Sequence, residues 1–292
     1  MAERNAKLIL MVGVLGVSAS AILVRFSQAP SGVTAAYRLG WTVLLLLPVV
    51  LLRCRAELRR VTARDLVLCG ASGVLLALHF LTWFESLKRT SVASSTVLVS
   101  TEVIFTALGF ALFLHGKIPR LGVWAILLAF GGSALLALSG GGGAGGLSGN
   151  LLALAAASAA AVYTLIGRVQ RGHLCTTVYT FLTYLACFLT LLLGTAAAGT
   201  PLTGYGGREW LIGLALAVLC TLLGHSLFSW CLKYLSPSYV SAAKLCEPVF
   251  SSLAAIPLFG EVPGPLQLAG GAAVLGAVLL YTWAEREKTP AG

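Results

Sequence analysis

Long apolar stretches alternate with short polar connections along the whole chain. A helix needs about 20 mainly apolar residues to cross the hydrocarbon core of a bilayer, and each stretch is about that long. Because no connection is long enough to hold a soluble domain, the pattern predicts an all-α integral membrane protein. The ten expected transmembrane helices are residues 8–27, 32–52, 65–86, 91–114, 120–139, 150–170, 175–198, 209–232, 236–259 and 264–283.

Composition excludes a water-soluble globular protein. Of the 292 residues, 58% are apolar and only 10% are charged, whereas a soluble domain has roughly a quarter charged residues. The net charge of +10 would suggest a nucleic-acid partner in a soluble protein. Here most basic residues lie in the connections between apolar stretches, where they act as topology signals, so no nucleic-acid partner is expected.

Lysine and arginine are unequally shared between the two sets of alternate connections. Cytoplasmic connections retain positive charge, so the richer set predicts that both termini are cytoplasmic and that the protein crosses the inner (plasma) membrane many times. The poorer set has only Arg25, Lys88, Arg89 and Arg208. The richer set comprises Arg4, Lys7, Arg53, Arg55, Arg59, Arg60, Arg64, Lys117, Arg120, Arg168, Arg171, Lys233, Arg286 and Lys288.

The chain contains an internal repeat. A shift of 145 positions superimposes residues 87–131 on 232–276 without a gap and pairs Glu102 with Glu247. The glycine-rich stretch at 140–146 marks the join, which predicts two five-helix repeats, residues 1–143 and 144–292. Because five is an odd number, the second repeat must enter the membrane from the opposite side. Such a 5+5 inverted-topology repeat is typical of secondary transporters with a site near the membrane midplane.

The two paired glutamates are the strongest chemical signal. Glu102 and Glu247 are each about the twelfth residue of an expected transmembrane helix. An ionisable group at that depth costs at least ~2.5 kcal/mol and usually faces a cavity or a partner. A protonated glutamate that binds a neighbouring helix is the structural alternative.

Two cations are available to the glutamates, and the sequence leaves the pairing open. Lys244 precedes Glu247 by three residues, which places the ammonium and the carboxylate on one helical face. Arg38 lies in the second expected helix and is the alternative partner for Glu102. Without a partner, Glu102 would be the candidate for a proton-linked switch.

Histidines and aromatic residues form a second group of candidates. His79 and Trp83 are one turn apart in the third expected helix, and His225 and Trp230 lie in the eighth. A polar ring inside a bilayer needs either a neighbouring helix or a ligand as its partner. No metal-ligand spacing is present, so neither a metal nor a cofactor is expected. The predicted substrate contacts are His79, Trp83, Glu102, Tyr163, His225, Trp230, Lys244 and Glu247.

Several segments resemble the EamA family of the drug/metabolite transporter superfamily. They are LHFLTWFESLKRTSVASSTVLVSTE at 78–102, GRVQR at 167–171, GH at 224–225 and CEPVFSSLAAIPLFGE at 246–261. The resemblance implies a central cavity lined by the first, third and fourth helices and their repeat counterparts. It also implies alternating-access transport of metabolites such as amino acids, nucleosides or drugs.

The chain departs from this family pattern in its first repeat. Val103 stands where the family usually has proline, and His115 and Gly116 replace the usual Gly-Glu. Because proline removes a backbone donor and permits a kink, only the ninth helix, with Pro248, is expected to be broken and to move.

Together these features predict a secondary transporter of small metabolites, with export as the expected direction and proton coupling through Glu102 as a hypothesis. A passive facilitator is the main alternative, followed by a lipid scramblase and a membrane-embedded enzyme. No enzymatic activity is expected, because no nucleophile or metal set lies near the interface. The expected partners are a small-molecule substrate and the lipid bilayer, and a homodimer is left open.

Overall fold

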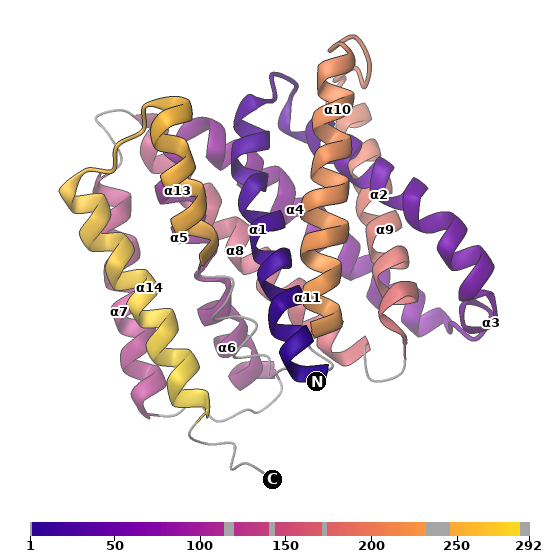
Figure 1. The fold of residues 1–292 in the computed structure, drawn as a ribbon, viewed down its shortest axis with the longest axis horizontal. Coiled ribbons are helices and arrows are strands. Elements are labelled where there is room, and N and C mark those ends of the chain that lie inside the picture. The colour runs from indigo at the N-terminus through magenta and orange to yellow at the C-terminus, as the bar shows by residue number, and fades with distance from the viewer. Residues whose placement is uncertain (1, 114–119, 140–143, 171–173, 232–245, 287–292) are drawn as a thin grey trace.

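The fold is described from a computed structural model, which covers residues 2–113, 120–139, 144–170, 174–231 and 246–286. Within these ranges the secondary structure is helical and contains no strand (Figure 1). The helices are α1 (Ala2–Phe26), α2 (Ser31–Arg53), α3 (Arg55–Leu58), α4 (Ala63–Arg89), α5 (Val92–Val99), α6 (Glu102–Phe113), α7 (Arg120–Ser139), α8 (Ala144–Gln170), α9 (Thr176–Ala197), α10 (Gly207–Ala215), the π-helix η1 (Leu216–His225), α11 (Ser226–Cys231), α13 (Cys246–Phe259) and α14 (Pro265–Arg286).

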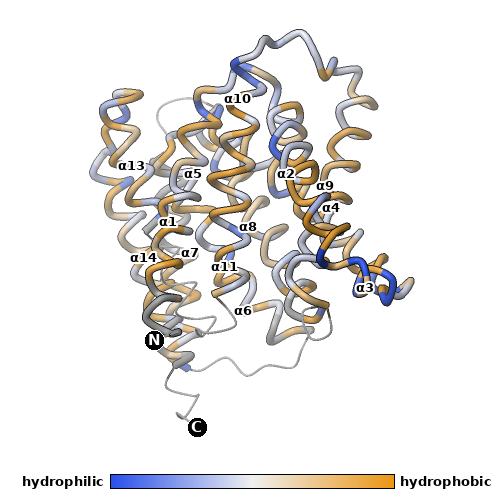
Figure 2. Tube along the Cα trace, turned by 45° about the vertical axis from the view of Figure 1, so that its right-hand side comes forward, coloured by the Kyte–Doolittle hydropathy of each residue, from blue (hydrophilic) through white to orange (hydrophobic). Residues whose placement is uncertain are grey.

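Six helical segments are long and apolar enough to cross a membrane. They are Leu8–Phe26, Ser31–Arg53, Ala63–Arg89, Gly146–Gly167, Thr176–Ala197 and Gly207–Phe228. Four shorter apolar helices accompany them, namely Val92–Thr106, Arg120–Gly132, Glu247–Phe259 and Pro265–Tyr281. Figure 2 shows that apolar residues follow the helices through the bundle, whereas the short helix α3 at one end is hydrophilic. The prediction of an all-α membrane protein is therefore confirmed.

The helices pack in a reciprocal pattern. α1 lies against η1, α11 and α13, while α8 lies against α4, α5 and α6. Two further pairs, α2 with α9 and α7 with α14, complete the bundle. α1 begins and α14 ends at the same end of the bundle (Figure 1). The largest apolar core lies where α1, α2, α4 and α9 meet η1, and it includes Phe80, Phe84 and Tyr184.

Glycines permit the closest helix contacts. A Cβ atom on Gly16 of α1 would lie 2.5 Å from the backbone oxygen of Leu219 in η1. Another on Gly224 would lie 2.5 Å from Val17. Since apolar helices gain no hydrophobic driving force from association inside a bilayer, this close packing is a main source of their attraction.

The expected helix at 91–114 is interrupted. α5 ends at Val99, a turn follows at Ser100 and Thr101, and α6 begins at Glu102. In this turn the Thr101 hydroxyl donates to the carbonyl of Leu98 over 2.6 Å and competes with the regular helical pattern. The expectation that only the ninth helix is broken was therefore wrong, because side-chain hydroxyls break the first repeat without the proline.

The expected helix at 209–232 contains a second irregularity, the ten-residue π-helix η1. The hydroxyl of Thr221 donates to the carbonyl of Leu216, five residues earlier. Ser226 repeats the same spacing by donating to Thr221. π-Helical segments are rare and are often found at functional sites, and this one ends at His225.

Substitution of Gly16 by alanine tests the packing of α1 on η1. The added methyl group must push the two backbones apart, so we expect a loss of roughly 1–3 kcal/mol and a lower unfolding temperature of the purified protein. Gly70→Ala is the matched control, because no atom lies within 4 Å of a Cβ built on Gly70. Equal unfolding temperatures for the two variants would contradict this account.

Candidate functional site

A small cavity lies inside the bundle, where α1, α4, α5, α6, η1, α11 and α13 converge. Its volume is about 60 Å³, which holds a few water molecules but is well below the ~300 Å³ of the smallest typical ligand pockets. A metabolite therefore fits only if the surrounding helices move apart. The lining residues are Val17, Ser20, His79, Trp83, Thr96, Val99, Ser100, Glu102, Val103, His225, Phe228 and Glu247.

Both repeat-related glutamates line this central cavity. Glu102 is the first residue of α6, directly after the break, where the positive end of the helix dipole favours a carboxylate. In addition, the hydroxyl of Thr164 in α8 donates to Glu102 Oε1 over 2.8 Å. Glu247 lies in α13, next to residues outside the described ranges. The helix start and the Thr164 hydroxyl thus lower the cost of Glu102 in an apolar bundle.

Two aromatic rings of α4 form one wall of the cavity. His79 and Trp83 stack with ring centroids 5.8 Å apart and an interplanar angle of 28°. His79 Nδ1 lies 3.0 Å from the carbonyl oxygen of Ala156, and since a carbonyl only accepts, we place a proton on Nδ1. The Trp83 Nε1 donor is buried and has no acceptor among the described residues. It is therefore available to an acceptor group of a ligand.

His225 also lines the central cavity. Its ring contacts Phe80 and Phe228 edge to face, at centroid distances of 6.5 and 6.4 Å. The position of His225 at the end of the π-helix, which follows α10 without interruption, brings it to the cavity beside α1. The two predicted histidines therefore lie on one cavity although they are far apart in the chain.

Arg38 is fully buried behind the cavity. Its Nε donates to the Thr221 hydroxyl over 2.8 Å, and its Nη1 donates to the Ser20 hydroxyl over 3.1 Å. The guanidinium lies over the Phe80 ring, 4.3 Å from the centroid. Among the described residues no carboxylate forms an ion pair with Arg38. The pairing of Arg38 with one of the two glutamates stays a prediction.

Two further predicted contacts, Tyr163 and Trp230, do not line the central cavity. Tyr163 is half-buried and packs against the largest apolar core. Trp230 is 37% exposed and belongs to the outer surface of the bundle. Lys244 lies outside the described residues. No group of three or more possible metal ligands occurs in the described part of the chain.

Hydroxyl residues of the cavity were missed by the sequence analysis. Ser20, Thr96 and Ser100 contribute hydroxyl groups to the lining. Thr96 and Ser100 are four residues apart and so share a helical face, which was a usable signal. Inside an apolar helix, however, the same pattern also arises from hydroxyls that bond their own backbone, as Thr96 does to Val92 over 2.7 Å.

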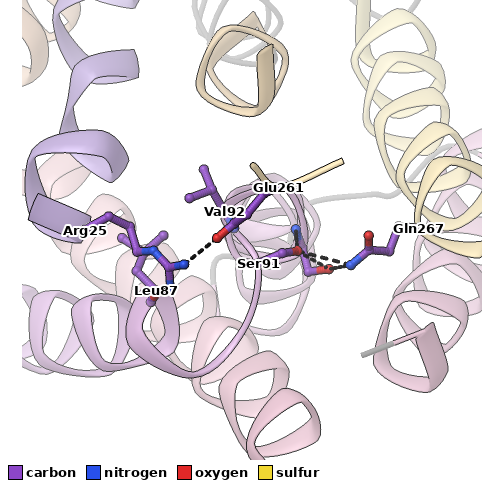
Figure 3. A network of polar contacts seen from close by, with 7 residues as sticks. Arg25, Leu87, Ser91, Val92, Glu261 and Gln267 are labelled. Atoms are coloured by element: carbon purple, nitrogen blue, oxygen red, sulfur yellow. Dashed lines mark hydrogen bonds and ion pairs between the residues drawn. The ribbon is translucent and has the colours of Figure 1, made fainter. Parts of the chain in front are cut away.

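A larger cavity of about 470 Å³ lies at the end of the bundle opposite the start of α1. The helices α1, α4, α5 and α13 contribute residues to both cavities; in α5 and α13, for example, Ala93 and Ser252 line the outer cavity, while Thr96 and Glu247 line the central one. At its edge the carboxylate of Glu261 forms an ion pair with Arg25 (Figure 3). Other lining residues are Lys88, Arg89, Thr90, Ser91, Gly146, Ala255, Gly260, Val262, Pro263 and Gln267.

A bundle of apolar membrane helices around an interior cavity with paired carboxylates defines the class of multi-pass membrane transporters. The model of the EamA-like transporter family matches residues 5–138 and again residues 147–283. The chain therefore belongs to the EamA-like transporter family, as the sequence motifs predicted.

Known relatives agree with this class. The chain is 24% identical over 207 residues to "Pseudopaline exporter CntI" of Pseudomonas aeruginosa, which covers 71% of this chain and 72% of the relative. It is 36% identical over 100 residues to an uncharacterized transporter of Archaeoglobus fulgidus, 34% of this chain and 36% of that protein. A solved crystal structure shares the fold with a TM-score of 0.64, at 20% identity over 98% of this chain and 99% of the other.

Removal of the Thr221 hydroxyl tests the hydrogen bonds that hold Arg38. In Thr221→Val the buried Nε of Arg38 loses its acceptor, so we expect a destabilisation of about 1–3 kcal/mol, seen as a lower unfolding temperature. Thr190→Val is the matched control, because the Thr190 hydroxyl bonds only the carbonyl of Ala186 in its own helix. If both variants unfold at the same temperature, the Thr221 hydroxyl does not hold Arg38 in place.

Proposed function

We propose that this protein is a secondary transporter that exports a small metabolite by alternating access through the central cavity. The observation that carries this proposal is the pair Glu102 and Glu247, which come from equivalent positions of the chain and line one interior cavity. Acids cost free energy inside a bilayer, and they usually serve a substrate or ion pathway there. Around them, Trp83, His79 and His225 offer ring surfaces and nitrogens for a polar substrate.

The proposed architecture is an inverted repeat of five helices in residues 1–143 and five in 144–292. The reciprocal packing supports it: α1 of the first half packs on η1 and α11 of the second, and α8 of the second half packs on α4 of the first. The pairs α2 with α9 and α7 with α14 each join equivalent helices. This exchange is what a twofold axis in the membrane plane would produce.

In the proposed orientation both termini are cytoplasmic and the 470 Å³ cavity faces the outside. Lys and Arg are concentrated at the opposite end, which favours this direction. The outer cavity is wide, whereas the central one is too small for a metabolite. The cycle therefore needs a change of helix arrangement around Glu102. The break at Ser100 and Thr101 and the π-helix η1 supply one irregular segment on each side of the site.

Export is the proposed direction because one relative is a named exporter. We propose that proton coupling runs through Glu102. Its carboxylate accepts a hydrogen bond from the neutral hydroxyl of Thr164 and forms no ion pair with any described cation. A carboxyl group without a fixed countercharge is able to take up a proton when the substrate leaves.

Substitution of Glu102 by glutamine tests proton coupling. In proteoliposomes with an identified substrate, the wild type should respond to an imposed pH gradient, and Glu102→Gln should transport at the rate measured without a gradient, because the amide cannot exchange the proton. Glu85→Gln is the control: Glu85 pairs with Arg89 near the end of α4 and does not line the central cavity.

A gradient response that survives in Glu102→Gln would reject coupling through this residue. Counterflow of labelled substrate in the absence of any ion gradient distinguishes an ion-coupled transporter from a passive facilitator. A wild-type protein that shows counterflow but no accumulation under a pH gradient is a passive facilitator.

Cysteine labelling tests the orientation. Thr203, which lies between α9 and α10, and Arg59, which follows α3, are both exposed. The start of α10 and helix α3 lie toward opposite ends of the bundle (Figure 1). In intact cells, a membrane-impermeant thiol reagent should label Thr203→Cys above the background of the native cysteines. Arg59→Cys should be labelled only after the membrane is opened. The reverse result would place both termini outside the cell.

A further inference from the structure

The outer cavity has the size and charge of a ligand site in its own right. Its volume of about 470 Å³ lies within the ~300–1,000 Å³ typical of small-molecule pockets. Three cationic side chains, Arg25, Lys88 and Arg89, line it together with one carboxylate, that of Glu261. This cavity is separate from the central one, because no residue lines both.

Positive charge remains in the cavity after its ion pairs are counted. Arg89 is matched by Glu85, 2.8 Å away on the same helix. Lys88 is exposed, and its ammonium donates to the carbonyl of Ala29 over 2.6 Å. No described carboxylate forms an ion pair with Lys88. A concave surface with an uncompensated cation concentrates anions from solution.

The carboxylate of Glu261 occupies a cradle that is built for a carboxylate. One of its oxygens pairs with the Arg25 guanidinium, and the other accepts the backbone N–H of Val92 over 2.8 Å (Figure 3). A second hydrogen bond holds the Arg25 guanidinium in place, because its Nη1 donates to the carbonyl of Leu87 over 2.6 Å. Such charge-assisted bonds to both oxygens give a carboxylate strong and directional binding.

The chain delivers Glu261 to this cradle with a special turn. α13 ends at Phe259, and Gly260 has a φ of +66°, the left-handed conformation that glycine adopts without strain. The pair remains reachable, because the side chains of Arg25 and Glu261 are 25% and 19% exposed. A solute in the cavity therefore meets a carboxylate that is tethered but not sealed.

The carboxylate of the ion pair belongs to only one half of the duplicated chain. The shift of 145 positions, which superimposes residues 87–131 on 232–276, pairs Glu261 with Gly116. Because glycine has no carboxylate, the first half cannot form the equivalent ion pair at this position.

We propose that the outer cavity is a second ligand site, which binds the carboxylate of a small organic anion on Arg25 and the Val92 amide, with Glu261 as its intramolecular competitor. The bound anion accepts the hydrogen bonds of Arg25 and the Val92 N–H in place of Glu261, and the positive charge of Lys88 attracts it further. Displacement of Glu261 also detaches the turn between α13 and α14 from α1 and α5. This site does not depend on proton coupling or on the direction of transport.

Binding of benzoate to the purified full-length protein tests the proposal, with benzamide as a neutral molecule of the same shape. A tethered competitor acts at an effective concentration of the order of millimolar, so wild-type binding should be weak. Glu261→Ala removes the competitor and should bind benzoate at least about tenfold more tightly. Benzamide should show no such gain.

Three second substitutions in the Glu261→Ala background locate the site. Arg25→Gln should abolish the gain. Arg208→Gln should retain it, because Arg208 is a cation at the same end that bonds the carbonyl of Phe26 and does not line the cavity. Glu102→Gln should also retain it, which separates this site from the proposed transport site.

Three results would overturn the proposal: equal benzoate affinity in wild type and Glu261→Ala, an equal gain for benzamide, or equal losses with Arg25→Gln and Arg208→Gln. If Glu261→Ala does not fold, Glu261→Gln takes its place, since it removes the charge and keeps the side chain's size. Failure of benzoate binding would leave the transport proposal intact, because that proposal is measured by substrate flux through the central cavity.

Discussion

The cost of a carboxylate in an apolar bundle governs the arrangement of this protein. Glu102 is tolerated because it lies at the start of α6, where the backbone N–H groups point toward the acid. A helix start inside a membrane requires a break in the transmembrane segment. In the first half this break lies at Ser100 and Thr101, and Thr101 is buried in the bundle. The acid and the irregular backbone thus stabilise each other.

A buried cation accompanies the irregular segment η1 in the second half. Arg38 is fully buried and needs acceptors that a regular apolar helix does not offer. Thr221 in the π-helix and Ser20 in α1 supply them. The close approach of α1 to η1, which Gly16 and Gly224 permit, brings these two hydroxyls to one guanidinium. Helix packing, backbone irregularity and buried charge are therefore parts of one arrangement around the central cavity.

At the outer end the charged side chains Arg25 and Glu261 interact more weakly than buried charges would, because water reaches them. The Arg25 and Glu261 side chains are partly exposed, so their pair costs little to open compared with a fully buried pair. An ion pair of that kind suits a place where a solute must compete, whereas the buried Arg38 suits a fixed structural element. The two buried hydrogen bonds of Arg38 near the central cavity thus contrast with the partly exposed Arg25–Glu261 pair at the outer cavity.

The apolar stretches by themselves determined the all-helical membrane class, and the motifs at 78–102 and 246–261 determined the family, because length, hydropathy and short signatures are properties of local sequence. The pairing of Glu102 with Glu247 was also visible, since a repeat preserves spacing. The helix break at Ser100, the π-helix before His225 and the outward position of Trp230 were decided only by tertiary structure. Each depends on which neighbour satisfies a backbone group or covers a side chain. Periodicity places a residue on a face of its helix but does not say which helix, cavity or lipid lies opposite.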